Sequence, residues 1–320
     1  MKRRRFASLL LAAAVSCLAA PLALAQQTNT IIIGFAAGGS VDATARLLAE
    51  QLTKITGDTY IVENRTGAAG RIAINAVKRA APDGKTLVLV PQGPMTLFPN
   101  TFASLDYEPR TDFTPIGRLV TQENVLVLAN DVPATNGAEL KAWLQQNPGL
   151  ASFGSPGTGT VPHFVGEAVA HRLGVPMTNV PYKGSALTAN DVASGVLKLG
   201  FMPAADALPL VRQGRMKILA TTGAERSPLT PDYPTMREVG IDYSLDGWYA
   251  LFGPAGMDPK LVESLNANVV KAMSEPSVVE RLGTLALVAA PGSPTELTEL
   301  VERERAEWAE LVRETGFKPL

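Results

Sequence analysis

Hydrophobic positions along the first part of the chain alternate between two spacings. Short apolar runs rich in β-branched residues, typical of buried strands, occur at 30–35, 60–63 and 86–90. Between them, at 41–56 and 71–81, apolar residues recur every three or four positions, which predicts two amphipathic helices. The order strand, helix, strand, helix, strand is typical of a parallel sheet with right-handed crossovers.

The middle of the chain repeats this alternation with different turns, and the C-terminal part is helical. Strands are expected at 125–128, 152–153, 179–182, 197–201 and 218–221. Helices are expected at 138–146, 162–173, 187–194, 259–274, 277–285 and 294–315. This order predicts a second α/β unit followed by a return to the first, with two crossings near 120–125 and 246–252.

The expected fold class is therefore α/β, with two lobes that are each a mostly parallel sheet flanked by helices. The first lobe would comprise 26–122 and, after the return, 248–320, while the second lobe would comprise 123–247. The first 25 residues are set apart from both lobes by their composition.

The N-terminus has the composition of an export signal. Positions 2–5 are basic, positions 6–25 are apolar apart from two serines, and the stretch ends in the small-residue pattern Ala23-Leu24-Ala25. This predicts a secretory signal peptide over 1–25, cleaved after Ala25. A membrane anchor is the alternative, since about 20 apolar residues could span a bilayer. Whether the general or the twin-arginine route exports the protein stays open.

Composition fits one large or two moderate globular domains, because 46% of the 320 residues are hydrophobic and 18% are charged. Without the signal the net charge is near −5, since four of the 29 basic residues lie at 2–5 and all 30 acidic residues remain. An acidic chain without a run of Lys or Arg argues against nucleic-acid binding, which depends on neutralising phosphates. The single cysteine lies within the signal, which excludes disulfides and a thiol nucleophile from the mature chain.

Motifs of common enzyme classes are incomplete in this sequence. The two histidines, His163 and His171, have no spacing typical of metal ligands. Phe153 stands where the nucleophile motif G-x-S-x-G of serine hydrolases requires its first glycine, which weakens Ser155 as a nucleophile. Thr160 stands where a phosphate-binding loop requires lysine, and no dinucleotide-binding fingerprint follows. We therefore expect no metal, nucleotide or other cofactor.

Two glycine-bearing turns, each between a predicted strand and a predicted helix, are the most informative feature. The first runs from Ile33 to Asp42 and the second from Gly154 to His163. Both present free backbone N–H groups at a helix N-terminus, where the helix dipole favours an anion. Taken alone, each could be merely a tight turn with a good helix cap. Two of them, one in each expected lobe, favour a small carboxylate held in a cleft at the carboxyl ends of the strands.

Nine short segments in a fixed order cover nearly the whole chain after the signal. They are FAAGGSVDATAR (35–46), VENRTGAAG (62–70), APDGKTL (81–87), DFTPIG (112–117), NPG (147–149), FGSPGTGTVPH (153–163), VPYKG (180–184), YPTMREVG (233–240) and WYALFGPAG (248–256). In this order they resemble the Bug-type (TctC-like) periplasmic substrate-binding proteins of tripartite tricarboxylate transporters. Any one segment alone is weak evidence for this family, but nine segments in the same order are specific to it.

The resemblance implies a periplasmic-binding-protein fold of the Venus flytrap type, whose cleft grips a small organic acid through loop backbone groups and ordered water. It implies a monomeric, non-enzymatic receptor in the periplasm. The receptor would hand a mono- or dicarboxylate, aliphatic or aromatic, to membrane subunits of a tripartite tricarboxylate transporter. Two alternatives stay open: an exported serine hydrolase that uses Ser155 with His163, and a ligand receptor for a membrane sensor kinase.

The resemblance also suggests which residues contact the ligand. They are Gly38, Gly39, Ser40 and Asp42 in the first turn, Ser155, Gly157, Thr158, Gly159 and His163 in the second, Tyr182, Lys183 and Gly184 on the opposite wall, and Gln92 and Gly93 past a strand. Glycines let main-chain amides approach a ligand, and hydroxyl groups donate hydrogen bonds. Asp42 would either brace its turn or accept from a ligand hydroxyl, ammonium or water. Lys183 would either supply charge or lie in solvent.

Two positions depart from the family pattern. The family usually has an acidic residue shortly after the strand that follows Pro-Tyr-Lys-Gly, where this chain has Phe201-Met202-Pro203, and Lys198 stands where the family commonly has Asp. Met202 would make that wall more apolar and suit a longer aliphatic or an aromatic acid.

Overall fold

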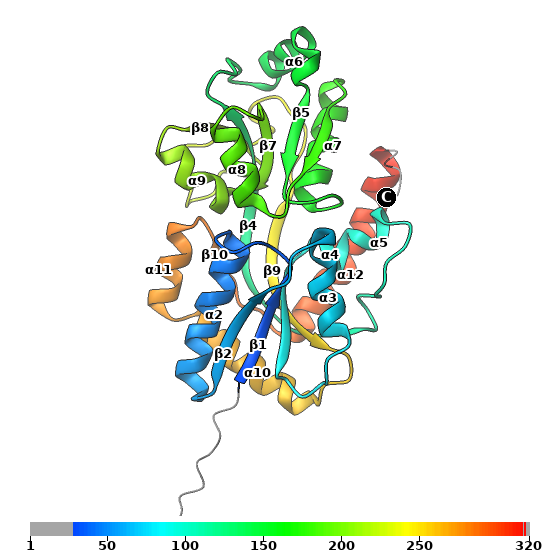
Figure 1. Ribbon diagram of the computed structural model, residues 1–320, viewed down its shortest axis with the longest axis vertical. Coiled ribbons are helices and arrows are strands. Elements are labelled where there is room, and N and C mark those ends of the chain that lie inside the picture. Colours follow the sequence, from blue (N-terminus) through cyan, green and yellow to red (C-terminus); the bar gives the residue numbers. More distant parts are fainter. Residues whose placement is uncertain (1–27, 316, 318–320) are drawn as a thin grey trace, which may run out of the picture.

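The computed structural model describes residues 28–315 and 317. The predicted signal peptide, 1–25, and its cleavage site lie outside these residues. Within the described part of the chain, no helix is both long enough and apolar enough to cross a membrane. Figure 1 shows two lobes, one above the other, with strands β4 and β9 running between them.

The sheet of the first lobe follows the predicted strand and helix order. Its parallel strands lie side by side in the order β2 (Thr59–Asn64), β1 (Thr28–Ile33), β3 (Thr86–Pro91). Helix α2 (Ser40–Thr56) follows β1, and helix α3 (Arg71–Lys78) precedes β3. Leu48 and Leu52 of α2 have no exposed surface, as expected for the apolar face of an amphipathic helix. The elements predicted for this lobe are confirmed, with ends shifted by up to three residues.

The second lobe contains another parallel arrangement, also as predicted. Its parallel strands are β6 (Thr178–Pro181), β5 (Ser152–Ser155) and β7 (Leu199–Pro203), in that spatial order. The other elements are α6 (Gly137–Gln146), α7 (Val161–Leu173), α8 (Ser185–Ala193), α9 (Ala204–Arg212) and β8 (Met216–Thr221). The sequence analysis did not predict α9, which has Pro209 inside it, a residue that normally ends a helix.

The two sheets share one long strand, β4 (Phe113–Ala129). Its first part pairs antiparallel with β9 (Asp246–Pro254), and from Asn124 onward it pairs with β7 and β8. The chain therefore crosses at Asn124 and returns to the first sheet at Asp246, near both predicted crossings. The short strand predicted at 125–128 was wrong in length, because register shifts near Pro115 and Gly117 interrupt the apolar pattern of the longer strand.

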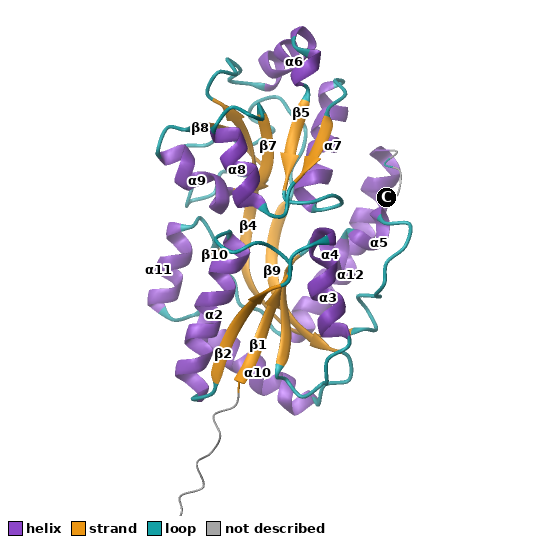
Figure 2. Cartoon of the chain, in the orientation of Figure 1, coloured by secondary structure: helices purple, strands orange, loops and turns teal. Residues whose placement is uncertain are grey.

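Helices cover both sheets, as Figure 2 shows. The C-terminal helices are α10 (Pro259–Met273), α11 (Pro276–Thr284) and α12 (Pro294–Thr315), close to their predicted ranges. The short elements are η2 (Ala68–Gly70), α4 (Gly93–Thr96), α5 (Phe98–Thr101), η3 (Pro148–Leu150) and β10 (Val288–Ala289). Trp308 of α12 packs edge-on against Phe164 of α7, with ring centroids 5.2 Å apart, so the last helix contacts the second lobe as well. The α/β fold with two lobes and two crossings is the fold expected from the sequence.

Candidate functional site

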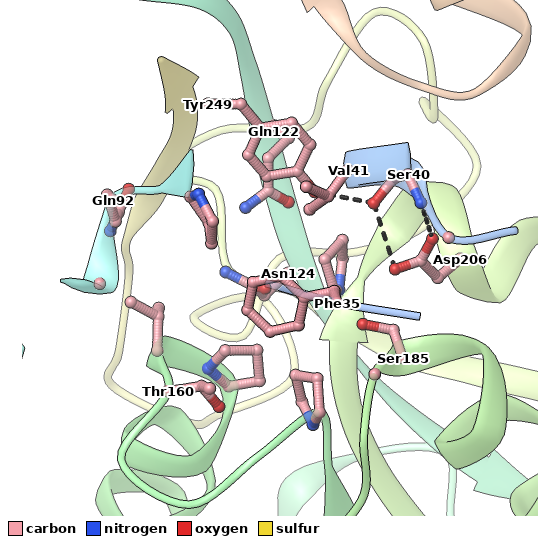
Figure 3. Close-up of a pocket in the computed structure, with 18 of the residues that line it drawn as sticks. Phe35, Ser40, Val41, Gln92, Gln122, Asn124, Thr160, Ser185, Asp206 and Tyr249 are labelled. Carbon is pink, nitrogen blue, oxygen red and sulfur yellow. Dashed lines mark hydrogen bonds between the residues drawn. The ribbon is translucent and has the colours of Figure 1, made fainter. Parts of the chain in front are cut away.

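The carboxyl ends of the parallel strands of both lobes converge on one pocket, shown in Figure 3. It encloses about 680 Å³, its open mouth included. The first lobe contributes Phe35, Ala36, Gly39, Ser40, Val41, Pro91, Gln92, Gly93, Pro94 and Phe98. The second lobe contributes Pro156, Thr160, Val161, Pro162, Gly184, Ser185, Ala186, Pro203 and Asp206, and the crossing strands contribute Gln122, Asn124 and Tyr249. The mostly apolar lining with a few polar side chains is typical of a site for a small molecule.

The first glycine turn brings the N-terminus of α2 to the pocket. Gly38 has φ +91°, a left-handed conformation that glycine adopts without strain. The backbone N–H of Ser40 donates to Oδ1 of Asp206 at 2.6 Å, and the Ser40 hydroxyl lies 3.2 Å from Oδ2 of the same carboxylate. The hydroxyl is also 2.8 Å from the Tyr249 hydroxyl. The positive end of α2 therefore already holds a carboxylate from the chain itself.

Asp206 was not among the residues proposed from the sequence. Burial raises the pKa of its carboxyl, while hydrogen bonds from Ser40 and Ser185 act in the opposite direction without cancelling the effect. Among the described residues that line the pocket, it is the only charged one. The sequence analysis noted Phe201-Met202-Pro203 where the family usually has an acidic residue, and it did not consider Asp206, three positions further on. The sequence signal that could have identified Asp206 is its position in the first helical turn after a predicted strand whose carboxyl end reaches the pocket.

Asp42, in contrast, braces the turn from behind. Its carboxylate accepts hydrogen bonds from the Gly38 amide at 3.1 Å, from Arg46 Nε at 2.9 Å and from Asn64 Nδ2 at 2.9 Å. Burial alone would raise its pKa, but the hydrogen bonds from Arg46, Asn64 and Gly38 outweigh burial, so the pKa is lowered. Of the two roles expected for Asp42, these contacts fit bracing.

The second glycine turn is held together by its own hydrogen bonds. The Gly159 amide donates to Nδ1 of His163 at 2.8 Å, and the hydroxyl of Thr160 donates to the Gly157 carbonyl at 2.7 Å. The Ser155 hydroxyl also donates to that carbonyl, at 3.3 Å. The turn thus faces the pocket with Pro156 and with the start of α7, where Thr160, Val161 and Pro162 lie.

This geometry does not prepare Ser155 for nucleophilic catalysis. Nδ1 of His163 is engaged by the Gly159 amide, and its Nε2 lies 3.3 Å from Oε1 of Glu167. A base must bond to the hydroxyl it activates, whereas the hydroxyl of Ser155 donates to a backbone carbonyl. The structure therefore gives no support to the hydrolase alternative.

The opposite wall meets the first lobe through its backbone. The Lys183 carbonyl accepts from the Ala36 amide at 3.3 Å, while the Lys183 residue as a whole is exposed. Tyr182 donates its hydroxyl to Oδ2 of Asp191 at 2.5 Å, and burial together with this carboxylate raises the pKa of Tyr182 to about 12. Gly184 alone of the three proposed residues lines the pocket, next to Ser185.

Three buried carboxamides face the pocket with unpartnered atoms. Gln92, which follows β3, is 2% exposed, and its Oε1 accepts from the backbone N–H of Trp248 at 3.1 Å. Within the described chain, Gln92 Nε2, both side-chain polar atoms of Asn124 and Oε1 of Gln122 have no hydrogen-bond partner. The sequence analysis proposed Gln92 but missed Gln122 and Asn124, because it started the crossing strand one residue after Asn124.

The predicted contacts thus divide into two groups. Gly39, Ser40, Gln92, Gly93 and Gly184 line the pocket. The proposed residues that do not line it are Gly38, Asp42, Ser155, Gly157, Thr158, Gly159, His163, Tyr182 and Lys183.

The two departures from the family pattern lie away from the pocket lining. Met202 has no exposed surface and belongs to the hydrophobic core. Lys198 forms an ion pair with Asp131 at 2.5 Å. Neither residue lines the pocket wall, so the expectation of a more apolar wall at Met202 was wrong.

Comparison with known proteins agrees with this architecture. The chain is 35% identical over 292 residues to the UPF0065 protein in the gbd 5' region of Cupriavidus necator, with 88% of each chain covered. The structure of R. palustris Rpa4515 with adipate superposes with a TM-score of 0.88 at 30% identity, covering 93% of this chain and 100% of that one. MatC (Rpa3494) from Rhodopseudomonas palustris with bound malate gives a TM-score of 0.86 at 30% identity, covering 89% and 99%.

A family model also matches most of the chain. Residues 44–317 match the model of the tripartite tricarboxylate transporter family receptor, TctC. The matched range begins within α2 and extends through both lobes and the C-terminal helices. Together with the shared fold, this confirms the resemblance found in the nine segments: the chain belongs to the TctC family of periplasmic carboxylate-binding receptors.

Proposed function

We propose that the protein captures a small organic acid between its two lobes in the periplasm and delivers it, as a monomer, to the membrane subunits of a tripartite tricarboxylate transporter. The moving bodies are residues 26–122 with 248–320, and residues 123–247. A ligand that touches both bodies stabilises the closed arrangement by its higher affinity for that arrangement. Because capture and closure are coupled, the transporter could distinguish ligand-bound from ligand-free receptors by their closed shape.

The observation that carries this proposal is the set of buried, unpartnered donors in the pocket. Nε2 of Gln92 and Nδ2 of Asn124 are amide donors without a partner among the described residues. A buried donor left unpaired costs about 1–3 kcal/mol, so both atoms favour a ligand that brings acceptor oxygens. A ligand carboxylate supplies such oxygens, and the two amides can bind them although no lysine or arginine of the described chain lines the pocket. The adipate and malate bound to the two similar proteins support an organic acid.

The proposed contacts follow from the pocket lining and the turns behind it. Gly39, Ser40, Gln92, Gly93 and Gly184 would contact the ligand directly. The turn residues behind them, from Ser155 to His163 and from Tyr182 to Gly184, would act through backbone groups and ordered water. Such indirect contacts can bind nearly as well as direct ones.

A thermal-shift panel of organic acids on refolded, ligand-free protein tests the capture of a carboxylate. At 100 times its dissociation constant, a true ligand should stabilise the folded state by about 2.7 kcal/mol. Amines and sugars of similar size should leave the midpoint unchanged. A panel in which no organic acid shifts the midpoint, or hydrolysis of a chromogenic ester at an enzymatic rate, would overturn the proposal.

Export and delivery are tested separately. The exported protein should begin at Gln26, as read by the mass of its N-terminal peptide. Uptake of the labelled acid should fall in cells that lack the receptor and return when it is supplied from a plasmid. Full uptake in those cells, with signalling lost instead, would favour the sensor-kinase alternative.

A further inference from the structure

The two ends of the pocket differ in chemistry. At one end, the Asp206 carboxylate lies against Ser40 and Ser185. Gln92 lies on the opposite side of the pocket in Figure 3, with Asn124 between the two ends. One end therefore presents carboxylate oxygens, and the other presents the amide donor Nε2 of Gln92, while Asn124 between them has both a donor, Nδ2, and an acceptor, Oδ1, without a partner in the described chain. A ligand that spans the pocket meets both.

The Asp206 end already has a carboxyl group of the chain at the position that would best hold an anion. The carboxylate of Asp206 accepts a hydrogen bond from the backbone N–H of Ser40 at 2.6 Å, in the first turn of α2. A ligand carboxylate placed beside it would put two like charges within a few ångströms in a partly dehydrated space. Such an arrangement is unfavourable unless one of the two carboxyls takes up a proton. This end instead suits a group that donates a hydrogen bond to Asp206.

The Gln92 end has the opposite requirement, and its orientation is fixed. Oε1 of Gln92 accepts from the backbone N–H of Trp248, so the amide cannot turn over without losing that bond. Its Nε2 is therefore fixed on the other side of the amide from Trp248, buried and without a partner in the described chain. Asn124, which is 1% exposed, has a second such donor, Nδ2. Buried polar atoms of this kind usually have a partner, which points to a ligand acceptor.

We infer that Gln92 and Asn124 bind the ligand's carboxylate, and that Asp206 selects a hydrogen-bond donor, a hydroxyl or an ammonium group, at the ligand's other end. The preferred ligand class is thus a monocarboxylate with a terminal donor, in preference to an unmodified dicarboxylate. This inference rests on the proposed function and adds the orientation of the ligand and the residue that discriminates between classes.

The first test compares ligands of equal length on the wild-type protein by calorimetry at neutral pH. The set consists of adipate, the unsubstituted monocarboxylate of the same chain length, and the corresponding ω-hydroxy and ω-amino monocarboxylates. We expect at least one of the two donor-bearing acids to bind about tenfold more tightly than adipate, a difference equivalent to about 1.4 kcal/mol. Tighter binding of adipate than of both donor-bearing acids would overturn the selection by Asp206.

The second test uses two isosteric variants. Asp206→Asn removes the charge and adds a donor, so it should shift the preference toward adipate by about tenfold or more. Gln92→Glu keeps an oxygen for the Trp248 amide and replaces Nε2 by a second oxygen. It should weaken binding of every acid by about a hundredfold, equivalent to about 2.7 kcal/mol. Gln145→Glu, at an exposed position of α6, is the matched control and should bind as the wild type does.

The outcomes separate this inference from the proposed function. If organic acids bind but Asp206→Asn leaves the preference unchanged, or Gln92→Glu binds normally, the orientation is wrong and the receptor function stands. If no organic acid binds the wild type, the proposed function fails and the orientation fails with it. Circular dichroism and the unfolding midpoint of each variant show whether lost binding reflects lost structure.

Discussion

Asp206 of the second lobe accepts a hydrogen bond from the backbone amide of Ser40 in the first lobe, at 2.6 Å and across 166 positions of sequence. The Ser40 hydroxyl extends this contact to Tyr249 on the crossing strand β9. A single carboxylate therefore connects both lobes and one of the two strands between them. The backbone contact between Ala36 and Lys183 is a second connection across the pocket.

Removing this carboxylate should loosen the closed arrangement. A hydrogen bond to a charged group contributes about 1.5–3 kcal/mol, so Asp206→Ala should shift the ligand-free protein toward open forms. Small-angle X-ray scattering should record a larger radius of gyration than for the wild type. Asp131→Ala, which removes an ion pair within the second lobe, is the matched control. An unchanged scattering curve for Asp206→Ala would show that the contact does not hold the lobes together.

Stability should fall as pH rises toward neutrality, in part because of Glu304. Burial raises the pKa of this carboxyl from 4.5 to about 7, although Trp248 Nε1 donates to it at 2.8 Å. The folded protein then holds a proton that the unfolded chain has lost, so stability is lost between about 4.5 and about 7. Glu304→Gln keeps an acceptor for Trp248 and should flatten this slope in urea unfolding.

Two other carboxyls serve as references for that experiment. The pKa of Glu123 is likewise raised to about 7, first by burial and then by Asp246, so some of the slope should persist in Glu304→Gln. Glu280→Gln, at an exposed position of α11, should retain the full slope of the wild type. A Glu304→Gln profile identical to that of the Glu280 variant would contradict the prediction.

Gly34 is required by close backbone packing next to the first turn. A Cβ at this position would lie 2.3 Å from the Cα of Gly70, an atom that no side-chain rotation can move away. Gly34→Ala should therefore destabilise the protein by about 1–3 kcal/mol, the usual cost of overpacking. Gly149→Ala, where a Cβ meets nothing within 4 Å, should change stability by less than about 0.5 kcal/mol. Equal urea midpoints for the two variants would refute this explanation.

A charge at Gly157 should abolish binding without unfolding the protein. A Cβ here would lie 3.5 Å from Ala69, which belongs to the first lobe, so the side chain would project between the lobes. Gly157→Asp would place a carboxylate where the lobes meet and would repel an acidic ligand. Gly157→Ala imposes the same backbone strain at φ +158° without the charge, so it should lose much less affinity than Gly157→Asp does. Calorimetry that finds full affinity in Gly157→Asp would place the ligand elsewhere.

Local patterns in the sequence were sufficient for most elements of the fold. The apolar spacing of 41–56 predicted α2 within one residue, and proline and glycine marked the turns that end the strands. Such signals work because a helix face or a buried strand is encoded by neighbouring residues. They failed for β4, whose pairing with β9 shifts register near Pro115 and Gly117.

The site was predictable only in part. The first glycine turn predicted a loop that reaches the pocket, since Gly39 and Ser40 line it, whereas none of the residues proposed in the second turn does. The same reasoning expected His163 and Ser155 to face the ligand, whereas hydrogen bonds within the turn hold both behind its surface. Which way a loop side chain points depends on contacts that differ by small energies, and sequence spacing does not contain them.

The sequence by itself determined the order of strands and helices, the export signal expected at the N-terminus and the family to which the chain belongs. Only the tertiary structure decided that Asp206 occupies the end of α2 and that Trp248 orients Gln92 across 156 positions. The reason is physical: these residues are far apart in the sequence, and they are close in space only because β4 and β9 join the two sheets. The chemistry of the pocket is therefore a property of strand pairing over long sequence distances, which no local pattern records.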